Sequence, residues 1–145
     1  VSSTVPATEY SLNNTATIEA FVDAFNSRDL DKVMTFFTPD AVYHNMPGPP
    51  VSGTDAVRKL IESFVAPAEK VDWENLAVAE TGNKVLTERI DRFVIAGKNV
   101  ELPVMGTFEF TNGKISAWRD YFDMATWQRQ MGSQSPPEFP LIQLP

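Results

Sequence analysis

The sequence predicts an α+β domain in which three to four helices cover the concave side of a curved, mixed or antiparallel β-sheet that wraps into an open half-barrel, or cone. Three observations predict this fold. Apolar residues recur at helical spacing in the first half of the chain. From Val71 the spacing changes to every second residue. Turn signals at 81–83, 96–99 and 111–114 divide the second half into four extended segments, which are expected to form an antiparallel meander.

The first two helices are predicted from their apolar residues. One is expected over 15–27, because four apolar side chains lie there at offsets of three, four and seven: Ile18, Phe21, Val22 and Phe25. Asp29 can accept hydrogen bonds from the backbone N–H groups of a turn that begins at Leu30, so a second helix is expected to start there. Its apolar residues continue to Phe37, and residues 38–40 are expected to end it.

The remaining elements follow from breakers and caps. Segment 41–46 is a short extended run that the proline-rich loop 47–50 stops. Thr54 is expected to cap a third helix that ends before Pro67. Residues 126–131 are expected to form a short terminal helix.

The chain is predicted to hold one domain over 15–132, with a flexible Ser/Thr-rich arm over 1–14 and a proline-rich tail over 133–145. The first residues lack the basic and apolar regions of a signal peptide, so a cytoplasmic location is expected. No apolar run approaches the roughly 20 residues of a membrane helix.

Charge and composition argue against several classes of function. Twelve Lys and Arg against nineteen Asp and Glu give a net charge of -7, which disfavours nucleic acid or an anionic membrane as a partner. The chain has no cysteine, one histidine and no G-x-S-x-G motif, so a hydrolytic triad or a zinc site is not expected. Common nucleotide, phosphate-loop and calcium motifs do not occur, and no cofactor is expected. Chemistry must then rest on carboxylates, tyrosine, asparagine and arginine.

Two predicted strands place polar groups where a half-barrel should present apolar ones. Arg89 and Asp91 are two residues apart, so their side chains share one face. Asp120 shares a face with two aromatic residues, Trp118 and Phe122, and is expected to lie out of bulk water. A carboxylate in such a place needs a partner.

Segment 41–46 adds a phenol and an amide. Tyr43 and Asn45 share one face, opposite to His44, which is expected to be a surface or loop histidine. Taken singly, these groups have ordinary structural explanations, such as a solvated ion pair, a cap or a turn. If the three faces line one concavity, they form a single set: Asp91, Arg89, Asp120, Tyr43 and Asn45.

Three strings of the sequence resemble the limonene-1,2-epoxide hydrolase family: V-L-T-E-R-I-D over 85–91, W-R-D-Y-F-D over 118–123 and Y-H-N over 43–45. The resemblance extends from about Thr15 to Met131 in element order and motif spacing. It implies the cone-shaped fold of the nuclear transport factor 2 superfamily, also called SnoaL-like, and usually a homodimer. The arm and the tail lie outside the resemblance.

The resemblance also implies roles for the polar set. Asp120 would be the ionised general base that activates a water held by Tyr43 and Asn45, and Asp91 would be the protonated acid beside the epoxide oxygen. Arg89 would lie between the two carboxyls. The implied reaction is the one-step addition of water to a small apolar epoxide, cyclic or terpene-like, to give a vicinal diol without a covalent intermediate.

An apolar pocket is expected around this set. Position along the strands nominates five sheet residues as its wall: Phe93, Leu102, Val104, Trp118 and Phe122. The resemblance adds three residues from the helices: Val22, Phe25 and Phe64.

Two other readings stay open, because one fold hosts many functions. The first is a steroid isomerase or polyketide cyclase, in which one of the aspartates would abstract a carbon-bound proton. Cyclases of this shape generally lean on a His-Asp pair, and His44 is turned away from Tyr43 and Asn45. The second is a non-catalytic module for an apolar ligand, in which Arg89 and Asp91 form a structural ion pair.

Overall fold

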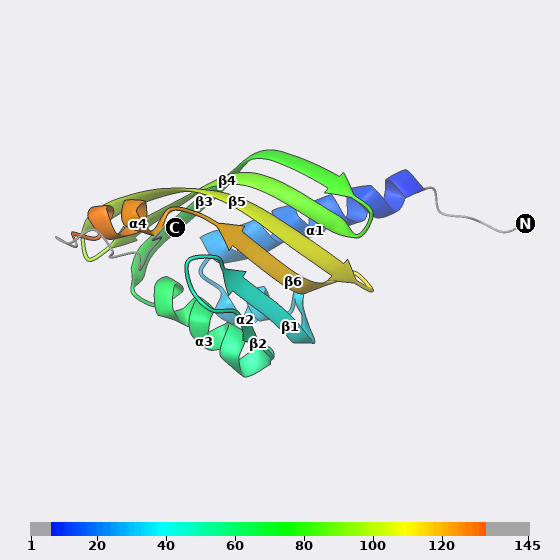
Figure 1. The fold of residues 1–145 in the computed structure, drawn as a ribbon, viewed down its shortest axis with the longest axis horizontal. Helices are drawn as coiled ribbons and strands as arrows, with labels where there is room; N and C mark the ends of the chain where they lie inside the picture. Colours follow the sequence, from blue (N-terminus) through cyan, green and yellow to red (C-terminus); the bar gives the residue numbers. More distant parts are fainter. Residues whose placement is uncertain (1–6, 133–145) are drawn as a thin grey trace, which may run out of the picture.

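The computed structural model describes residues 7–132, with side chains from residue 14 onward. Its elements, shown in Figure 1, follow one another in this order: α1 (Ala7–Asn26), α2 (Leu30–Met34), β1 (Phe37–Asn45), β2 (Val51–Ser52), α3 (Thr54–Val65), β3 (Ala68–Thr81), β4 (Lys84–Ile95), β5 (Lys98–Thr111), β6 (Lys114–Tyr121) and α4 (Met124–Gln130).

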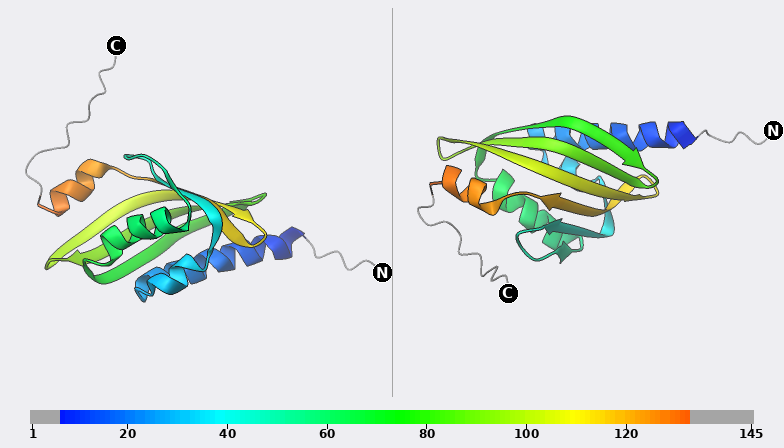
Figure 2. Two further views of the ribbon diagram at one scale, coloured as in Figure 1. Left: turned by 90° about the horizontal axis from the view of Figure 1, so that it is seen from below. Right: turned by 45° about the horizontal axis from the view of Figure 1, so that its top comes forward.

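The six strands form one mixed sheet in the order β2-β1-β6-β5-β4-β3. β1 runs parallel to β6, whereas the other neighbouring strands are antiparallel. The sheet stays open, because its edge strands β2 and β3 do not pair with each other. The predicted α+β fold with a meander from β3 to β6 is confirmed, and the strand arrangement can be followed in Figure 2.

The helices share one hydrophobic core with the inward side of the sheet. α1 contacts β3 and β4, α3 contacts β1, β2 and β3, and α4 contacts β5. Phe21 of α1 is central to this core, because its ring meets five other rings edge to face: Phe25, Phe36, Phe37, Phe108 and Trp118. Among the described residues, no helix combines the length and apolar character needed to cross a membrane.

The predicted turns are present at the ends of the long strands. At two of them both central residues have positive φ: Ala96 and Gly97 between β4 and β5, and Asn112 and Gly113 between β5 and β6. This is the backbone form that matches the twist of a two-residue hairpin. These two turns therefore fix the pairing register of β4, β5 and β6, the strands that carry most of the predicted site residues.

The N-terminal helix is longer than predicted. α1 begins at Ala7, so residues 7–14 of the expected arm are helical. No glycine or proline interrupts residues 7–26, which explains why the helix continues backwards. Residues 1–6 and the predicted tail, 133–145, lie outside the described residues.

The second helix is shorter than predicted. Asp29 caps it as expected, accepting a hydrogen bond from Lys32 N at 3.1 Å, but the helix ends at Met34. Phe37 instead begins β1 and pairs with Ile115 of β6. The register shifts between Phe37 and Val42, and this irregularity accommodates Pro39 within a strand.

Two helix ends also differ from the predictions. The N-cap of α3 is Gly53, with φ 89°, and Thr54 is the first helical residue instead of the cap. α4 runs from Met124 to Gln130 and therefore starts two residues earlier than expected. It does so because Asp123 caps it, accepting from Ala125 N at 3.1 Å and Thr126 Oγ1 at 2.9 Å.

Candidate active site

A buried ion pair lies on the inward face of β4. Arg89 and Asp91 are two residues apart, and both side chains point to this face, as the spacing predicts. Arg89 Nε donates to Asp91 Oδ1 at 2.6 Å and Nη2 donates to Oδ2 at 3.0 Å, a bidentate pair. The residues are only 1% and 4% exposed. The pair is therefore not a solvated surface contact.

A second carboxylate completes the cluster from β6. Arg89 Nη2 also donates to Asp120 Oδ2 at 2.7 Å. The other oxygen of Asp120 accepts a hydrogen bond of 2.7 Å from Trp118 Nε1. Asp120 is 3% exposed, and both of its carboxylate oxygens have a fixed donor. One guanidinium thus joins two carboxyl groups, one of them 2 residues and the other 31 residues away from it along the chain.

A glycine on β5 makes this cluster possible. β5 lies between β4 and β6, and Gly106 is the register partner of both Thr87 and Asp120. A Cβ atom at Gly106 would lie 2.7 Å from Asp120 Oδ1 and 2.9 Å from Arg89 Nη1. Sequence reasoning missed this residue, although an isolated glycine within a strand pattern is a recognised sign of close approach.

β1 carries the phenol and the amide to the same place. β1 is parallel to β6, and its register sets Tyr43 beside Trp118 and Asn45 beside Asp120. The Tyr43 ring stacks on the Trp118 indole with a centroid distance of 3.9 Å and an interplanar angle of 5°. His44 lies between Tyr43 and Asn45 in the chain, and its Nε2 is 2.9 Å from the carbonyl oxygen of Gly48. It is a loop-facing histidine, as predicted.

Trp73 of β3 covers the guanidinium. The centroid of its ring is 4.8 Å from Arg89 Cζ, a cation–π contact. Asn26, at the end of α1, fixes the backbone of Trp73 with two hydrogen bonds, of 2.7 Å to its N–H and 3.0 Å to its carbonyl oxygen. The ring also stacks on Phe25 at 4.2 Å. Sequence reasoning did not single out this tryptophan, although alternation along β3 puts it on the inward face.

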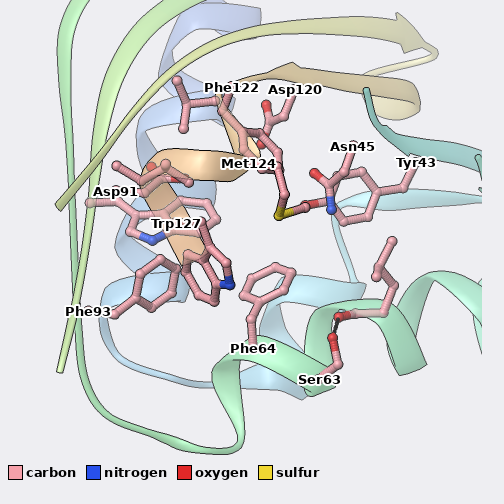
Figure 3. Close-up of a pocket in the computed structure, with 14 residues that line it drawn as sticks. Tyr43, Asn45, Ser63, Phe64, Asp91, Phe93, Asp120, Phe122, Met124 and Trp127 are labelled. Atoms are coloured by element: carbon pink, nitrogen blue, oxygen red, sulfur yellow. Dashed lines mark hydrogen bonds between the residues drawn. The ribbon is translucent and has the colours of Figure 1, made fainter. Parts of the chain in front are cut away.

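These groups border a cavity of about 330 Å³, shown in Figure 3. Four lining residues are the polar ones of the predicted set: Tyr43, Asn45, Asp91 and Asp120. Arg89 does not line the cavity but lies behind the two carboxylates it joins. The remaining wall is Leu60, Ser63, Phe64, Trp73, Phe93, Leu102, Val104, Phe122, Met124 and Trp127.

Five of the eight predicted wall residues line the cavity: Phe64, Phe93, Leu102, Val104 and Phe122. Trp118, Phe25 and Val22 do not. Trp118 is covered by the Tyr43 ring, and Phe25 is covered by Trp73, so both lie one layer deeper. Val22 is likewise in the core, 6% exposed. The residues not foreseen come from β3, α3 and α4.

Burial controls the proton affinities of the cluster. It raises the pKa of Asp91 to about 6, although the charge and hydrogen bonds of Arg89 lower it, and the charge of Asp120 adds to the rise. Burial also raises the pKa of Asp120, against the lowering by Arg89 and by the Trp118 N–H. Burial and then the Asp120 charge raise the pKa of Tyr43 well above its usual value. Tyr43 therefore remains a neutral phenol.

The arrangement can hold a carboxylic acid and a carboxylate side by side. Two ionised carboxylates and one guanidinium would leave a buried net negative charge, whereas one added proton makes the cluster neutral. The two carboxyls then titrate as a pair. In the described part of the chain, no three histidine, aspartate or glutamate side chains converge as a metal site requires.

Comparison with known proteins finds similarity to epoxide hydrolases. Residues 12–132 match the limonene-1,2-epoxide hydrolase catalytic domain. The chain is 32% identical over 123 residues to epoxide hydrolase EphG of Mycobacterium tuberculosis. The matched region covers 83% of this chain and 80% of EphG. An epoxide hydrolase of this type from M. tuberculosis superposes with a TM-score of 0.75 at 27% identity, covering 86% of this chain and 93% of the other.

The fold itself is more widely shared. A nuclear transport factor 2-like protein from Burkholderia pseudomallei superposes with a TM-score of 0.73 at 24% identity, covering 81% of this chain and 96% of the other. At that identity the likeness concerns the fold alone. The fold predicted from the resemblance is confirmed.

Proposed function

Because this chain belongs to the limonene-1,2-epoxide hydrolase family, we propose that it adds water to an epoxide in one step, with Asp91 as the acid and Asp120 as the base. The observation that carries the proposal is the joining of two buried carboxyls by Arg89 at the border of one apolar cavity. Acid and base are both needed, because opening the ring requires a nucleophile at carbon and a proton for the departing oxygen.

The surroundings favour a proton on Asp91. The charge of Asp120 raises the pKa of Asp91 beyond the effect of burial, whereas the Trp118 N–H lowers that of Asp120. Asp91 would donate to the epoxide oxygen from its place on β4. Asp120 would stay ionised, held by hydrogen bonds from Arg89 and Trp118.

Asp120 has helpers for holding water. Asn45 is its register partner on β1, and the neutral Tyr43 phenol lies two residues away on the same face. A water bound among the three would be oriented by a carboxylate, an amide and a hydroxyl. Placing the water and the epoxide in one partly dry cavity removes the entropy cost of bringing them together.

The proposed step balances with the residues present. The water oxygen bonds to one epoxide carbon as that carbon's bond to the ring oxygen breaks. Asp120 takes a proton from the water, and Asp91 gives its proton to the ring oxygen. The products are a vicinal diol and a cluster whose proton has moved to Asp120. The proton returns to Asp91 before the next turnover, with Arg89 charged throughout.

The proposed substrates are cyclic or terpene-like epoxides, since ten of the fourteen lining residues lie outside the polar set and nearly all of these are apolar or aromatic. The reaction as written requires no cofactor. A homodimer, expected from the family resemblance, stays a prediction that light scattering would test.

A hydration assay tests the proposal. The full chain, treated with a chelator, is incubated with cyclohexene oxide, and we expect the vicinal diol to form. A single turnover in ¹⁸O-labelled water should place the label in the diol at once. A first-turnover diol with unlabelled oxygen would mean a covalent enzyme intermediate and would reject the direct attack of water.

A cyclase that relies on a His-Asp pair is less favoured. His44 points to the carbonyl of Gly48, on the other face of β1 from Tyr43 and Asn45. A purely structural ion pair is also less favoured, because Asp91 alone would balance the charge of Arg89, and a structural pair would not require a second buried carboxylate.

A further inference from the structure

Four aromatic side chains from four different elements meet at one end of the cavity. Phe64 comes from α3, Trp73 from β3, Phe93 from β4 and Trp127 from α4, and all four line the cavity. Phe93 contacts the other three rings edge to face. The centroid distances and interplanar angles are 6.1 Å and 80° to Phe64, 6.0 Å and 83° to Trp73, and 5.6 Å and 89° to Trp127. Three edge-to-face contacts around one ring form a herringbone cluster.

This aromatic end is separate from the proposed water position. Figure 3 shows Phe64, Phe93 and Trp127 grouped together, with Tyr43 and Asn45 on the far side of the cavity. Asp91 is next to the cluster, because it pairs with Trp73 in the sheet and lies two residues before Phe93. An epoxide that accepts a hydrogen bond from Asp91 would therefore direct its substituent toward the aromatic end.

Phe64 and Trp127 keep ring surface that is open to the cavity, whereas most of the Trp73 ring is covered within the protein. Trp73 has one face stacked on Phe25 at 4.2 Å, and its ring also meets the Arg89 guanidinium. Phe64 and Trp127 are only partly buried, and they border the cavity from the two helices. A flat ring that enters between them would extend the edge-to-face arrangement. A saturated ring would gain apolar contact but would lack the matching quadrupole.

We propose that the preferred substrate carries an aryl group on the carbon chain of the epoxide, and that this group binds in the cluster of Phe64, Trp73, Phe93 and Trp127. The inference rests on the proposed function and extends its substrate class from cyclic and terpene-like epoxides to epoxides that carry an aryl substituent. Each aromatic pair contributes a preference of roughly two- to tenfold over apolar contact alone. Phe64 and Trp127 offer two such pairs, and at the lower part of the combined range of roughly four- to a hundredfold, about tenfold discrimination is expected.

A matched pair of epoxides tests the inference. Benzyloxirane and cyclohexylmethyloxirane have the same carbon skeleton, and the methylene group separates the ring from the epoxide, so the aryl group does not activate the reacting carbon. We expect kcat/KM to be about tenfold higher for benzyloxirane. Equal values, or a preference for the saturated compound, would overturn the inference.

Variants locate the preference. Phe93→Leu and Trp127→Leu should each bring the ratio of the two kcat/KM values toward one. Leu102→Ala is the matched control, because it removes an aliphatic part of the same wall and should lower both values while leaving their ratio near that of the natural chain. Trp127 lies on the partly buried α4, so its variant remains informative if Phe93→Leu does not fold. An unchanged ratio in Trp127→Leu and in a folded Phe93→Leu would contradict the assignment.

Failure of the inference can be told from failure of the proposed function. Conversion of cyclohexene oxide without conversion of benzyloxirane would overturn the aryl preference alone. If none of the three epoxides gave a diol, the proposed function would fall, and the substrate class with it.

Discussion

The indole ring of Trp73 lies over the guanidinium of Arg89, with 4.8 Å between the ring centroid and Cζ. Arg89 is held in its plane by the two carboxylates, but its Nη1 has no hydrogen-bond partner among the described residues. The carboxylates hold the guanidinium within its plane, and the Trp73 ring restrains it from one face. Asn26 and Phe25 in turn fix Trp73, so α1 contributes to the site without reaching the cavity.

Trp73 is accordingly predicted to be a positioning residue. Trp73→Leu should lower kcat for cyclohexene oxide by about tenfold, since a buried cation–π contact contributes up to about 2 kcal/mol, and Trp73→Phe should restore part of the loss. The Arg89 Nε–H resonance in NMR spectra should shift and broaden in Trp73→Leu. Trp127→Leu is the control, because it opens the same cavity without removing a ring from Arg89. Equal effects of both variants on kcat and on that resonance would mean that Trp73 only lines the cavity and does not position Arg89.

Removal of either carboxylate is predicted to stop turnover without unfolding the protein. Asp120→Asn and Asp91→Asn should each lower kcat by about a thousandfold, the size of a lost general base or acid. Circular dichroism should show an unchanged fold, because the amide keeps the shape of the side chain. Glu88→Gln is the matched control: it neutralises an exposed carboxylate on β4 and should retain activity. Full activity in Asp120→Asn would contradict the mechanism.

Strand alternation explains how much of the site was predictable. Arg89 and Asp91 are on one strand, so spacing alone fixes their common face, and the face of Asp120 follows in the same way. Alternation predicts which face of the sheet a side chain occupies, but not whether it reaches the cavity or lies beneath another side chain. Trp118 was therefore expected at the cavity wall, whereas Tyr43 stacks over it and places it one layer deeper.

The features that were missed depend on contacts between distant segments. Gly106 matters only because β5 passes between Thr87 and Asp120, and Asn26 matters only because the end of α1 meets β3. The boundary at Phe37 was misplaced for a related reason. Its apolar neighbours suit a helix or a buried strand, and pairing with β6 decides in favour of the strand.

The raised pKa of Asp91 predicts a pH dependence of both stability and activity. Burial raises this pKa from 3.8 to about 6, so between these values the folded protein binds more protons than the unfolded chain. The free energy of unfolding should therefore fall as pH rises through this interval, and Asp91 should contribute up to about 3 kcal/mol of this fall. Above pH 6 the acid is ionised, so kcat/KM should also fall.

Urea unfolding and initial rates at pH 4.5, 6 and 7.5 would measure this dependence. Asp91→Asn is the comparison, and its free energy of unfolding should change less over the same interval because only Asp120 remains to titrate. A natural chain that becomes more stable between pH 4.5 and 6, or a variant with the same slope, would show that Asp91 is not the group responsible.

Gly106→Ala is predicted to damage the site more than the fold. The added Cβ would lie within 3 Å of Asp120 Oδ1 and of Arg89 Nη1, so the guanidinium and the carboxylate would have to move apart. Overpacking of this kind costs about 1–3 kcal/mol of stability, and a displacement of about 1 Å in a catalytic group can cost a hundredfold in rate. Gly48→Ala is the control, since the nearest atom to a Cβ there is 3.9 Å away. Denaturation midpoints and kcat measured on both variants separate the two effects. If Gly106→Ala kept its kcat, the close approach of β5 to the cluster would have no part in holding Asp120 and Arg89 together.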